Sequence, residues 1–85
     1  MIRLSKLADY GIVIATHMAR HGDGQQTTPE IATATSIPQP MASKILKLLT
    51  RADVLASHRG VKGGYGLARP AAEITVAEVI EALEG

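Results

Sequence analysis

The feature that most limits the fold of this chain is a pair of prolines near its middle, Pro38 and Pro40. A proline disfavours the helical conformation of the residue before it, so segment 36–40 must interrupt a helix that reaches it. Pro40 itself suits the first turn of a new helix, because its missing N–H has no helical partner there. The prolines therefore predict two helices that meet at a short turn rather than one long helix.

A first helix is predicted from about Lys6 to His21, where apolar residues recur every three or four positions. Ser5 before this helix is a good N-cap residue, and Gly22 and Gly24 after it favour its end.

A second, shorter helix is predicted after the polar segment 22–26. Thr27 or Thr28 caps its start, and Pro29 lies in the first turn, where the missing N–H costs nothing. Glu30 then reaches back toward the cap, as in a capping box.

The third helix is predicted to begin at Pro40 and to be amphipathic. Its apolar stripe consists of Met41, Ile45, Leu48 and Leu49, with Ala42 and Leu46 beside it. The other side is polar and basic: Ser43, Lys44, Lys47, Thr50 and Arg51. A short helix, a turn and an amphipathic helix with a basic outer face are typical of a helix-turn-helix.

Two runs of strand-forming residues follow, Val54–His58 and Tyr65–Ala68. The glycine-rich segment 59–64 between them carries two cations, Arg59 and Lys62. Glycines adopt turn conformations and leave no side chains to obstruct a close approach. We therefore expect a β-hairpin whose tip presents these cations, as in the wing of a winged helix.

A last helix is predicted from the capping box between Thr75 and Glu78. Its apolar residues have the spacing of one helix face: Val76, Val79, Ile80 and Leu83. We expect these to pack on the core, with the glutamates outward. The order of elements predicts one domain over residues 1–85, mainly α-helical with a small β-hairpin wing, which is a winged helix-turn-helix.

A formal net charge of only +1 hides a strong separation of charge along the chain. Segment 38–69 holds six basic residues against Asp53 alone, whereas segment 70–85 holds four glutamates and no base. The basic residues are Lys44, Lys47, Arg51, Arg59, Lys62 and Arg69. The first segment therefore suits a phosphate-rich partner, and the second does not.

Several classes of protein are disfavoured. The chain has no cysteine, which excludes disulfides, thiol catalysis and thiolate metal sites within these residues. Its longest apolar stretch, 11–19, is too short for a membrane span, and no signal-peptide pattern is present. No nucleophile, base and orienting acid cluster at a known spacing. We expect a cytoplasmic protein that is not an enzyme and contacts no membrane.

Three other interpretations stay open. His17 and His21 are spaced like two ligands of one metal, although ordinary polar helix residues are the simpler explanation because no third ligand is evident. The glycine-rich segment superficially resembles a nucleotide loop, but such a loop follows a buried strand and opens a helix. A winged helix that binds another protein instead of DNA is the main alternative.

Burial of the apolar stripe would turn the exposed N-terminal residues of the third helix toward the major groove of DNA. Gln39, Ser43 and Lys44 would then reach base edges, while Lys47 and Arg51 meet phosphate. The wing cations would lie along the minor groove or the backbone. The complete set of predicted DNA-binding residues is Thr28, Gln39, Met41, Ser43, Lys44, Lys47, Arg51, Arg59 and Lys62.

Several segments carry a resemblance to a known family: residues 2–14, 31–38, 55–68 and 74–85. Together they resemble the IscR/NsrR family of iron–sulfur regulators, and most closely the branch that controls the SUF iron–sulfur assembly genes. The most specific part is the Arg-Gly-x-x-Gly-Gly-Tyr motif at 59–65.

The resemblance implies a transcription regulator of iron–sulfur assembly or redox and iron response genes. It implies a homodimer that binds a palindromic promoter site, with the third helix in the major groove and Arg59 beside it. Ser43 stands where some relatives carry an acidic base-reading residue, so their operator sequence does not carry over to this chain.

In this family a long helix after the winged domain makes the dimer, and a cysteine cluster before that helix holds an iron–sulfur cluster. Both are absent here, so the chain resembles an N-terminal domain without a cofactor of its own, and the cluster is expected in the full-length protein. Some members use an acidic residue on the first helix as a further cluster ligand given to the partner subunit, and Asp9 matches that position.

Overall fold

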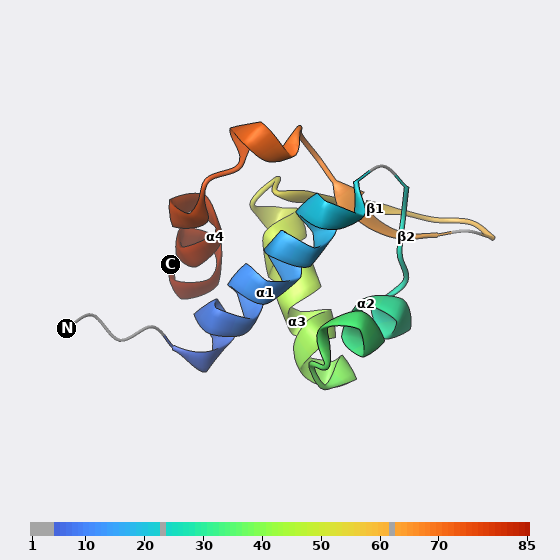
Figure 1. Cartoon of the computed structure of the whole chain (residues 1–85), viewed down its shortest axis with the longest axis horizontal. Helices are drawn as coiled ribbons and strands as arrows, with labels where there is room; N and C mark the ends of the chain where they lie inside the picture. Colours follow the sequence, from blue (N-terminus) through green and yellow to red (C-terminus); the bar gives the residue numbers. More distant parts are fainter. Residues whose placement is uncertain (1–4, 23, 62) are drawn as a thin grey trace.

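The computed structural model describes residues 5–22, 24–61 and 63–85, and its element order is that of a winged helix-turn-helix (Figure 1). The elements are α1 (Lys6–His21), α2 (Thr28–Thr35), α3 (Gln39–Arg51), β1 (Leu55–His58), β2 (Gly64–Leu67), the 3₁₀ helix η1 (Ala71–Glu73) and α4 (Val76–Glu84). The predicted fold class is confirmed. Only η1, between the hairpin and α4, was not expected from the sequence.

The predicted helix caps are present. Ser5 Oγ accepts a hydrogen bond from the Ala8 amide at 3.1 Å. Gly22, whose φ of 76° suits glycine, is the C-cap of α1. Thr27, rather than Thr28, caps α2. The Glu30 amide donates to Thr27 Oγ1 at 3.3 Å, and the Thr27 amide donates to Glu30 Oε1 at 2.8 Å. These caps fix where the helices start and stop.

The turn of the helix-turn-helix is built from Ser36 to Pro38. Ser36 adopts the left-handed conformation with φ of 58°, and the Ile37 amide donates to the Ala32 carbonyl at 3.2 Å. The Ile37 side chain is buried and fastens the turn to the core. Pro38 is the N-cap of α3, so this helix begins at Gln39, one residue earlier than predicted.

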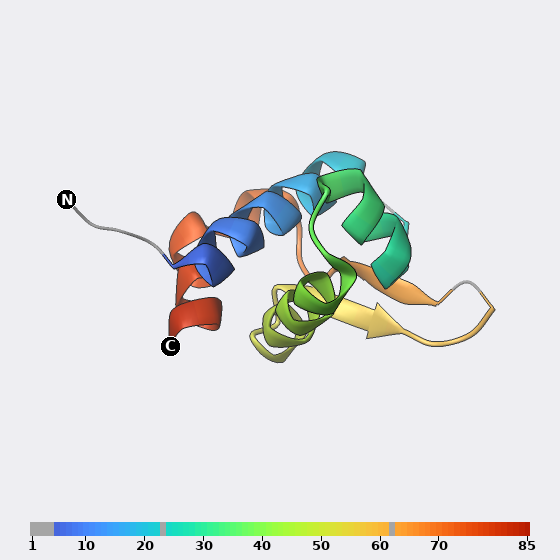
Figure 2. The ribbon, with the colours of Figure 1, turned by 90° about the horizontal axis from the view of Figure 1, so that it is seen from below.

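The core is apolar and is formed by residues of α1, α2, α3, the start of β1 and α4. Figure 2 shows how these elements are arranged. The largest fully buried side chains of the core are Ile14, Met18, Ile31, Ile45, Leu46, Leu49, Val54 and Leu55. With only two aromatic residues in the whole chain, both tyrosines, branched aliphatic side chains fill the interior. This core holds the outer face of α3 in a fixed direction.

Two predicted apolar stripes differ from the buried faces. The buried residues of α3 are Ala42, Ile45, Leu46 and Leu49, whereas Met41 and Leu48 are only half-buried. The difference arises because positions i, i+3, i+4 and i+7 counted from Ala42 share one helix face. In α4, Val79 and Leu83 are buried, but Val76 is 60% exposed because it lies in the first turn at the rim of the core.

The hairpin extends away from the helices (Figure 2). Its antiparallel strands pair Leu55 with Leu67 and His58 with Gly64. Buried Leu55 and half-buried Leu67 belong to the end that packs on the core, whereas His58 is exposed. The strands therefore project the described tip residues 59–61 and 63 beyond the helical body (Figure 2), which is where the sequence predicted a wing.

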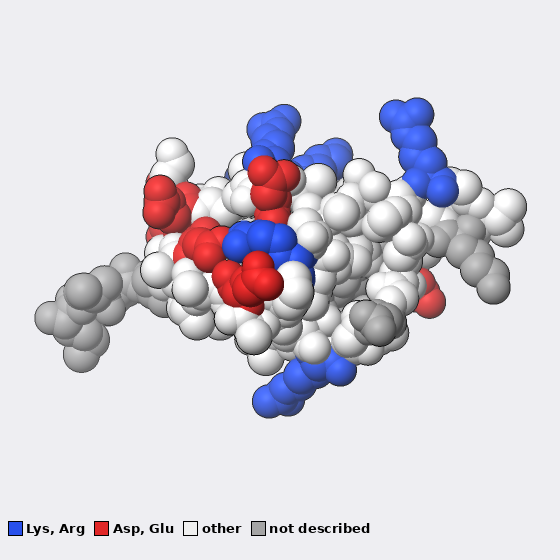
Figure 3. Space-filling view, turned by 90° about the horizontal axis from the view of Figure 1, so that it is seen from above, with Lys and Arg blue, Asp and Glu red and all other residues white. Residues whose placement is uncertain are grey.

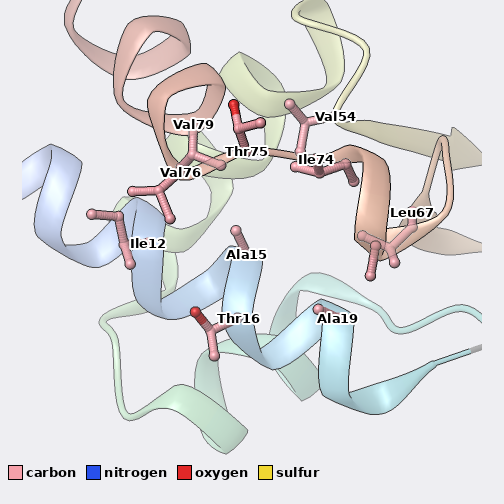
Figure 4. A pocket seen from close by; sticks show the side chains of 11 residues that line it. Ile12, Ala15, Thr16, Ala19, Val54, Leu67, Ile74, Thr75, Val76 and Val79 are labelled. Carbon is pink, nitrogen blue, oxygen red and sulfur yellow. The ribbon is translucent and has the colours of Figure 1, made fainter.

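An apolar pocket of about 120 Å³ lies between α1, α4 and the segment that joins β2 to α4 (Figure 4). Ile12, Ala15 and Ala19 approach it from α1, and Ile74 and Val76 approach it from the other side. The lining residues include no titratable side chain. Among the described residues, no helix is both long and apolar enough to cross a bilayer.

Candidate nucleic-acid interface

The outer face of α3 carries a line of cations. Lys44, Lys47 and Arg51 are exposed and stand at positions i, i+3 and i+7, so their side chains leave the helix on one side. That side is opposite the one formed by Ala42, Ile45, Leu46 and Leu49, which are all buried. The cationic line therefore faces away from the core along the length of the helix.

Gln39 and Ser43 lie beside this line, four residues apart on the same flank of α3. Gln39 is exposed in the first turn, while Ser43 is half-buried. Met41 is half-buried on the opposite flank and packs partly on the core. The N-terminal half of α3 thus presents an amide, a hydroxyl and Lys44 next to one another.

The wing supplies a second cationic point. Arg59 is exposed and directly follows β1, and the turn behind it is closed by a hydrogen bond from the Gly63 amide to the Gly60 carbonyl at 2.9 Å. Gly60 has φ of 117°, a conformation that favours glycine. Lys62, the other predicted wing cation, lies outside the described residues.

Two further features of the wing were not predicted. Val61 is fully exposed at the tip, although a β-branched apolar side chain gains nothing from water there. Its position between Arg59 and Lys62, in the predicted hairpin tip, is the sequence signal for its exposure. Gln26, which was expected only to lie in a loop, forms a β-bridge with Tyr65 of the wing.

Basic and acidic side chains gather on different parts of the molecule (Figure 3). Figure 3 shows cationic side chains projecting along one long edge, on the side of α3, and acidic side chains gathered toward the end that holds α4; a cation also projects from the opposite edge. The cations of the predicted basic segment 38–69 therefore lie in different places. Those of α3 are exposed on its outer face, whereas Arg69 lies among the acidic side chains near α4.

Arg69 is not available to a polyanion in the way the sequence suggested. Its guanidinium donates to the Glu78 carboxylate, which raises the pKa of Arg69 and lowers the pKa of Glu78 below its usual range. It also donates to the carbonyl oxygens of Asp53 and Glu73, at 3.2 and 3.3 Å. This cation joins structural elements, so of the charge counted in segment 38–69 it is the part that stabilises the fold.

Thr28 lies half-buried in the first turn of α2, next to the capping residue Thr27. Because α2 and α3 pack against each other, Thr28 belongs to the same helix-turn-helix as the outer face of α3. The structure gives Thr28 no hydrogen bond to another side chain among the described residues.

The two histidines of α1 do not form a recognisable metal centre. Their rings stack with centroids 6.2 Å apart, and His17 donates from Nε2 to Gln26 Oε1 at 2.6 Å. Within the described part of the chain, no group of three or more His, Cys, Asp or Glu side chains could hold a metal ion.

An iron–sulfur cluster does not fit the residues of this chain by themselves. Such clusters are held by cysteine thiolates, and the sequence contains none. Asp9 is exposed in the first turn of α1.

Comparison with known proteins agrees with this geometry. The sequence profile of the Rrf2 family, described as iron-dependent transcriptional regulators, matches residues 4–85. Protein aau3 of Rhizobium meliloti (strain 1021) is 37% identical over 83 residues, covering 98% of this chain and 54% of that protein. The putative HTH-type transcriptional regulator Rv1287 of Mycobacterium tuberculosis (strain ATCC 25618 / H37Rv) is 35% identical over 85 residues, covering 99% of this chain and 53% of that protein.

Two solved structures have nearly the same fold. CymR (YrzC), the global cysteine regulator of B. subtilis, matches with a TM-score of 0.91 and 30% identity over 100% of this chain and 67% of its own. IscR of T. potens matches with a TM-score of 0.90 and 32% identity over 99% of this chain and 62% of its own. The chain spans about half the length of the curated relatives it matches. It belongs to the Rrf2 family of transcriptional regulators.

Proposed function

We propose that this chain is the part of a transcription regulator that binds double-stranded DNA, with α3 in the major groove and the wing beside it. The observation that carries the proposal is the exposed line of Lys44, Lys47 and Arg51, directed away from an apolar core. A helix of this width fits the major groove, and cations on its outer face neutralise phosphate. Arg59, exposed at the end of β1, extends the same function to the wing.

The proposed contacts divide by chemistry. Lys47, Arg51 and Lys62 bind phosphates and supply affinity that is independent of sequence. Gln39, Ser43, Lys44 and Arg59 supply most of the selectivity, because amide, hydroxyl and cationic donors can read base edges. Thr28 at the start of α2 contacts the backbone, and half-buried Met41 packs against the DNA where α3 enters the groove.

The exposed side chain of Val61 completes the wing. With Arg59 two residues before it, Val61 gives the tip an apolar group next to a cation. Proteins that bind the minor groove often insert apolar side chains there. We assign Val61 a supporting contact of this kind.

The larger assembly is also a proposal. We infer that residues 1–85 act as the DNA-binding domain of a cytoplasmic homodimer that recognises a palindromic promoter site. The family resemblance supports this inference, because two equal domains related by a twofold axis match two equal half-sites. The genes proposed as targets are those of iron–sulfur assembly or of the redox and iron response.

An iron–sulfur cluster is proposed only for a full-length protein, as a sensor whose thiolate ligands lie outside this chain. In that setting Asp9, exposed on α1, would approach the cluster of the partner subunit as an additional oxygen ligand. The residues of this chain perform no reaction in the proposed function. They bind and orient, so no enzymatic activity is expected.

The function is tested by selecting duplexes from a random pool with the chain, both alone and fused to a dimerising coiled coil. The proposal predicts one enriched sequence, with two half-sites for the fused dimer, and an affinity that falls steeply with salt. No enrichment in either form, or binding that is insensitive to salt, would contradict it. That result would favour the alternative of a protein-binding winged helix.

A further inference from the structure

The wing has a second backbone partner besides its own hairpin. The Gln26 amide donates to the Tyr65 carbonyl at 3.0 Å, and the Tyr65 amide donates to the Gln26 carbonyl at 2.8 Å. Tyr65 belongs to β2, and Gln26 directly precedes Thr27, the N-cap of α2. The wing is therefore hydrogen-bonded to the entrance of the helix-turn-helix.

The contact is close enough to require glycine. A Cβ atom on Gly64 would lie 2.3 Å from the Gln26 carbonyl oxygen and 2.6 Å from its carbon, both backbone atoms that cannot rotate away. Gly64 also has φ of 151°, which side chains rarely adopt. Two residues further along β2, a Cβ on Gly66 would lie 3.3 Å from the Gly24 carbonyl oxygen. The loop before α2 thus lies directly against β2.

Gln26 is itself anchored to α1. Its side-chain oxygen accepts the hydrogen bond from His17 Nε2 at 2.6 Å, and His17 is half-buried on α1. The side chain of Gln26 therefore binds the helical body while its backbone binds the wing. A two-stranded hairpin with four-residue strands is only marginally stable alone, so these added bonds set its direction.

We propose that Gln26 is a positioning residue that fixes the angle between the wing and α3 and so directs Arg59 into the DNA groove. This inference rests on the proposed function and deepens it. A groove contact by an arginine depends on the placement of its planar guanidinium, and a wing ordered before binding loses less conformational entropy when it binds. Gly64 serves the same purpose, because only a residue without Cβ lets β2 reach Gln26.

The test is a double-mutant cycle on the selected duplex. Gly64→Ala should weaken binding about tenfold or more, similar to Arg59→Ala, and Arg59→Ala should add less than about twofold in the Gly64→Ala background. The losses from Gly64→Ala and Lys47→Ala should instead multiply, since Lys47 lies on α3. Gln26→Ala removes only the side-chain anchor and should give a smaller loss of affinity. In this background too, Arg59→Ala should cost less affinity than it does in the unmodified chain.

Gly22→Ala is the matched control. Gly22 also has a positive φ, of 76°, but a Cβ there would meet no atom within 4 Å. This variant carries backbone strain without the clash, and its effect should multiply with that of Arg59→Ala. Circular dichroism verifies that each variant is folded, and Gln26→Ala stands in for Gly64→Ala if the latter does not fold.

The outcomes separate the two proposals. If the unmodified chain binds DNA selectively but the losses from Arg59→Ala multiply with those from Gly64→Ala and Gln26→Ala, the positioning role is wrong and the proposed function stands. If the unmodified chain binds no duplex, either alone or fused to the dimerising coiled coil, both proposals are wrong.

Discussion

Arg69 forms an ion pair with Glu78 and thereby joins the end of the hairpin to α4. The same guanidinium donates to the Asp53 carbonyl just after α3 and to the Glu73 carbonyl at the end of η1. Glu78 in turn accepts from the Thr75 amide at 3.4 Å, as part of the capping box of α4. Arg69 therefore links α4, η1 and the segment that directly follows α3.

Replacing Glu78 by Gln should lower the urea midpoint of unfolding at neutral pH. The hydrogen bond from Arg69 depresses the pKa of Glu78 below its ordinary value of 4.5, so the charged carboxylate favours the folded state. This stabilisation is present above the unfolded-state pKa and disappears as the pH falls through the lower folded-state pKa. The difference between Glu78→Gln and the unmodified chain should therefore vanish on acidification.

Glu81→Gln, at an exposed position on the same helix, is the control and should leave the midpoint nearly unchanged at every pH. A deficit in Glu78→Gln that persists undiminished at about pH 3 would show that the carboxylate charge is not what stabilises α4.

Leu49→Ala should destabilise the fold by about 2–5 kcal/mol, because Leu49 is fully buried and its removal leaves a cavity. Leu48→Ala should cost clearly less, since Leu48 is half-buried at the flank of α3. Urea unfolding followed by circular dichroism measures both. Equal losses would mean that the buried face of α3 includes Leu48, as the sequence pattern alone suggested.

Thr27→Ala should cost about 1 kcal/mol of folding stability, because it removes the hydroxyl that accepts the Glu30 amide. Thr28→Ala, one residue later, removes a side chain that does not cap the helix and should cost less. Thermal unfolding of the two variants compares them directly. A larger loss for Thr28→Ala would place the cap one residue further along the chain.

Features that depend on neighbouring residues could be predicted from the sequence. Capping boxes, proline-induced breaks and glycine ends depend on residues within a few positions, so the helices were located to within one residue. The exact buried face was harder. Met41, Leu48 and Val76 fit an apolar pattern equally well whether they are central or peripheral, and only the packing of other elements decides their burial.

Contacts between distant residues could not be predicted. Gly11 reads as one member of an apolar pattern, yet a Cβ there would lie 2.3 Å from Leu83 Cδ1, so this glycine makes room for α4. Likewise, nothing near Gln26 in the sequence indicates its bridge to Tyr65, and Arg69 counts as a free cation until Glu78 lies beside it. Each depends on the tertiary arrangement.

Arg59→Ala should cost on the order of 1–3 kcal/mol of binding free energy on the selected duplex and much less on unrelated duplexes, because the proposed contact reads the groove. Fluorescence anisotropy with both duplexes measures the ratio of affinities. A loss of the same size on every duplex would assign Arg59 to phosphate binding alone.

The salt dependence of DNA binding tests most directly whether the outer face of α3 meets the double helix. Lys47→Ala should reduce the slope of log affinity against log salt concentration by about one, since it removes one phosphate contact. Arg20→Ala, which removes an equal charge from an exposed position on α1, should leave the slope unchanged. Equal reductions for the two variants, or none for Lys47→Ala, would contradict the proposed interface.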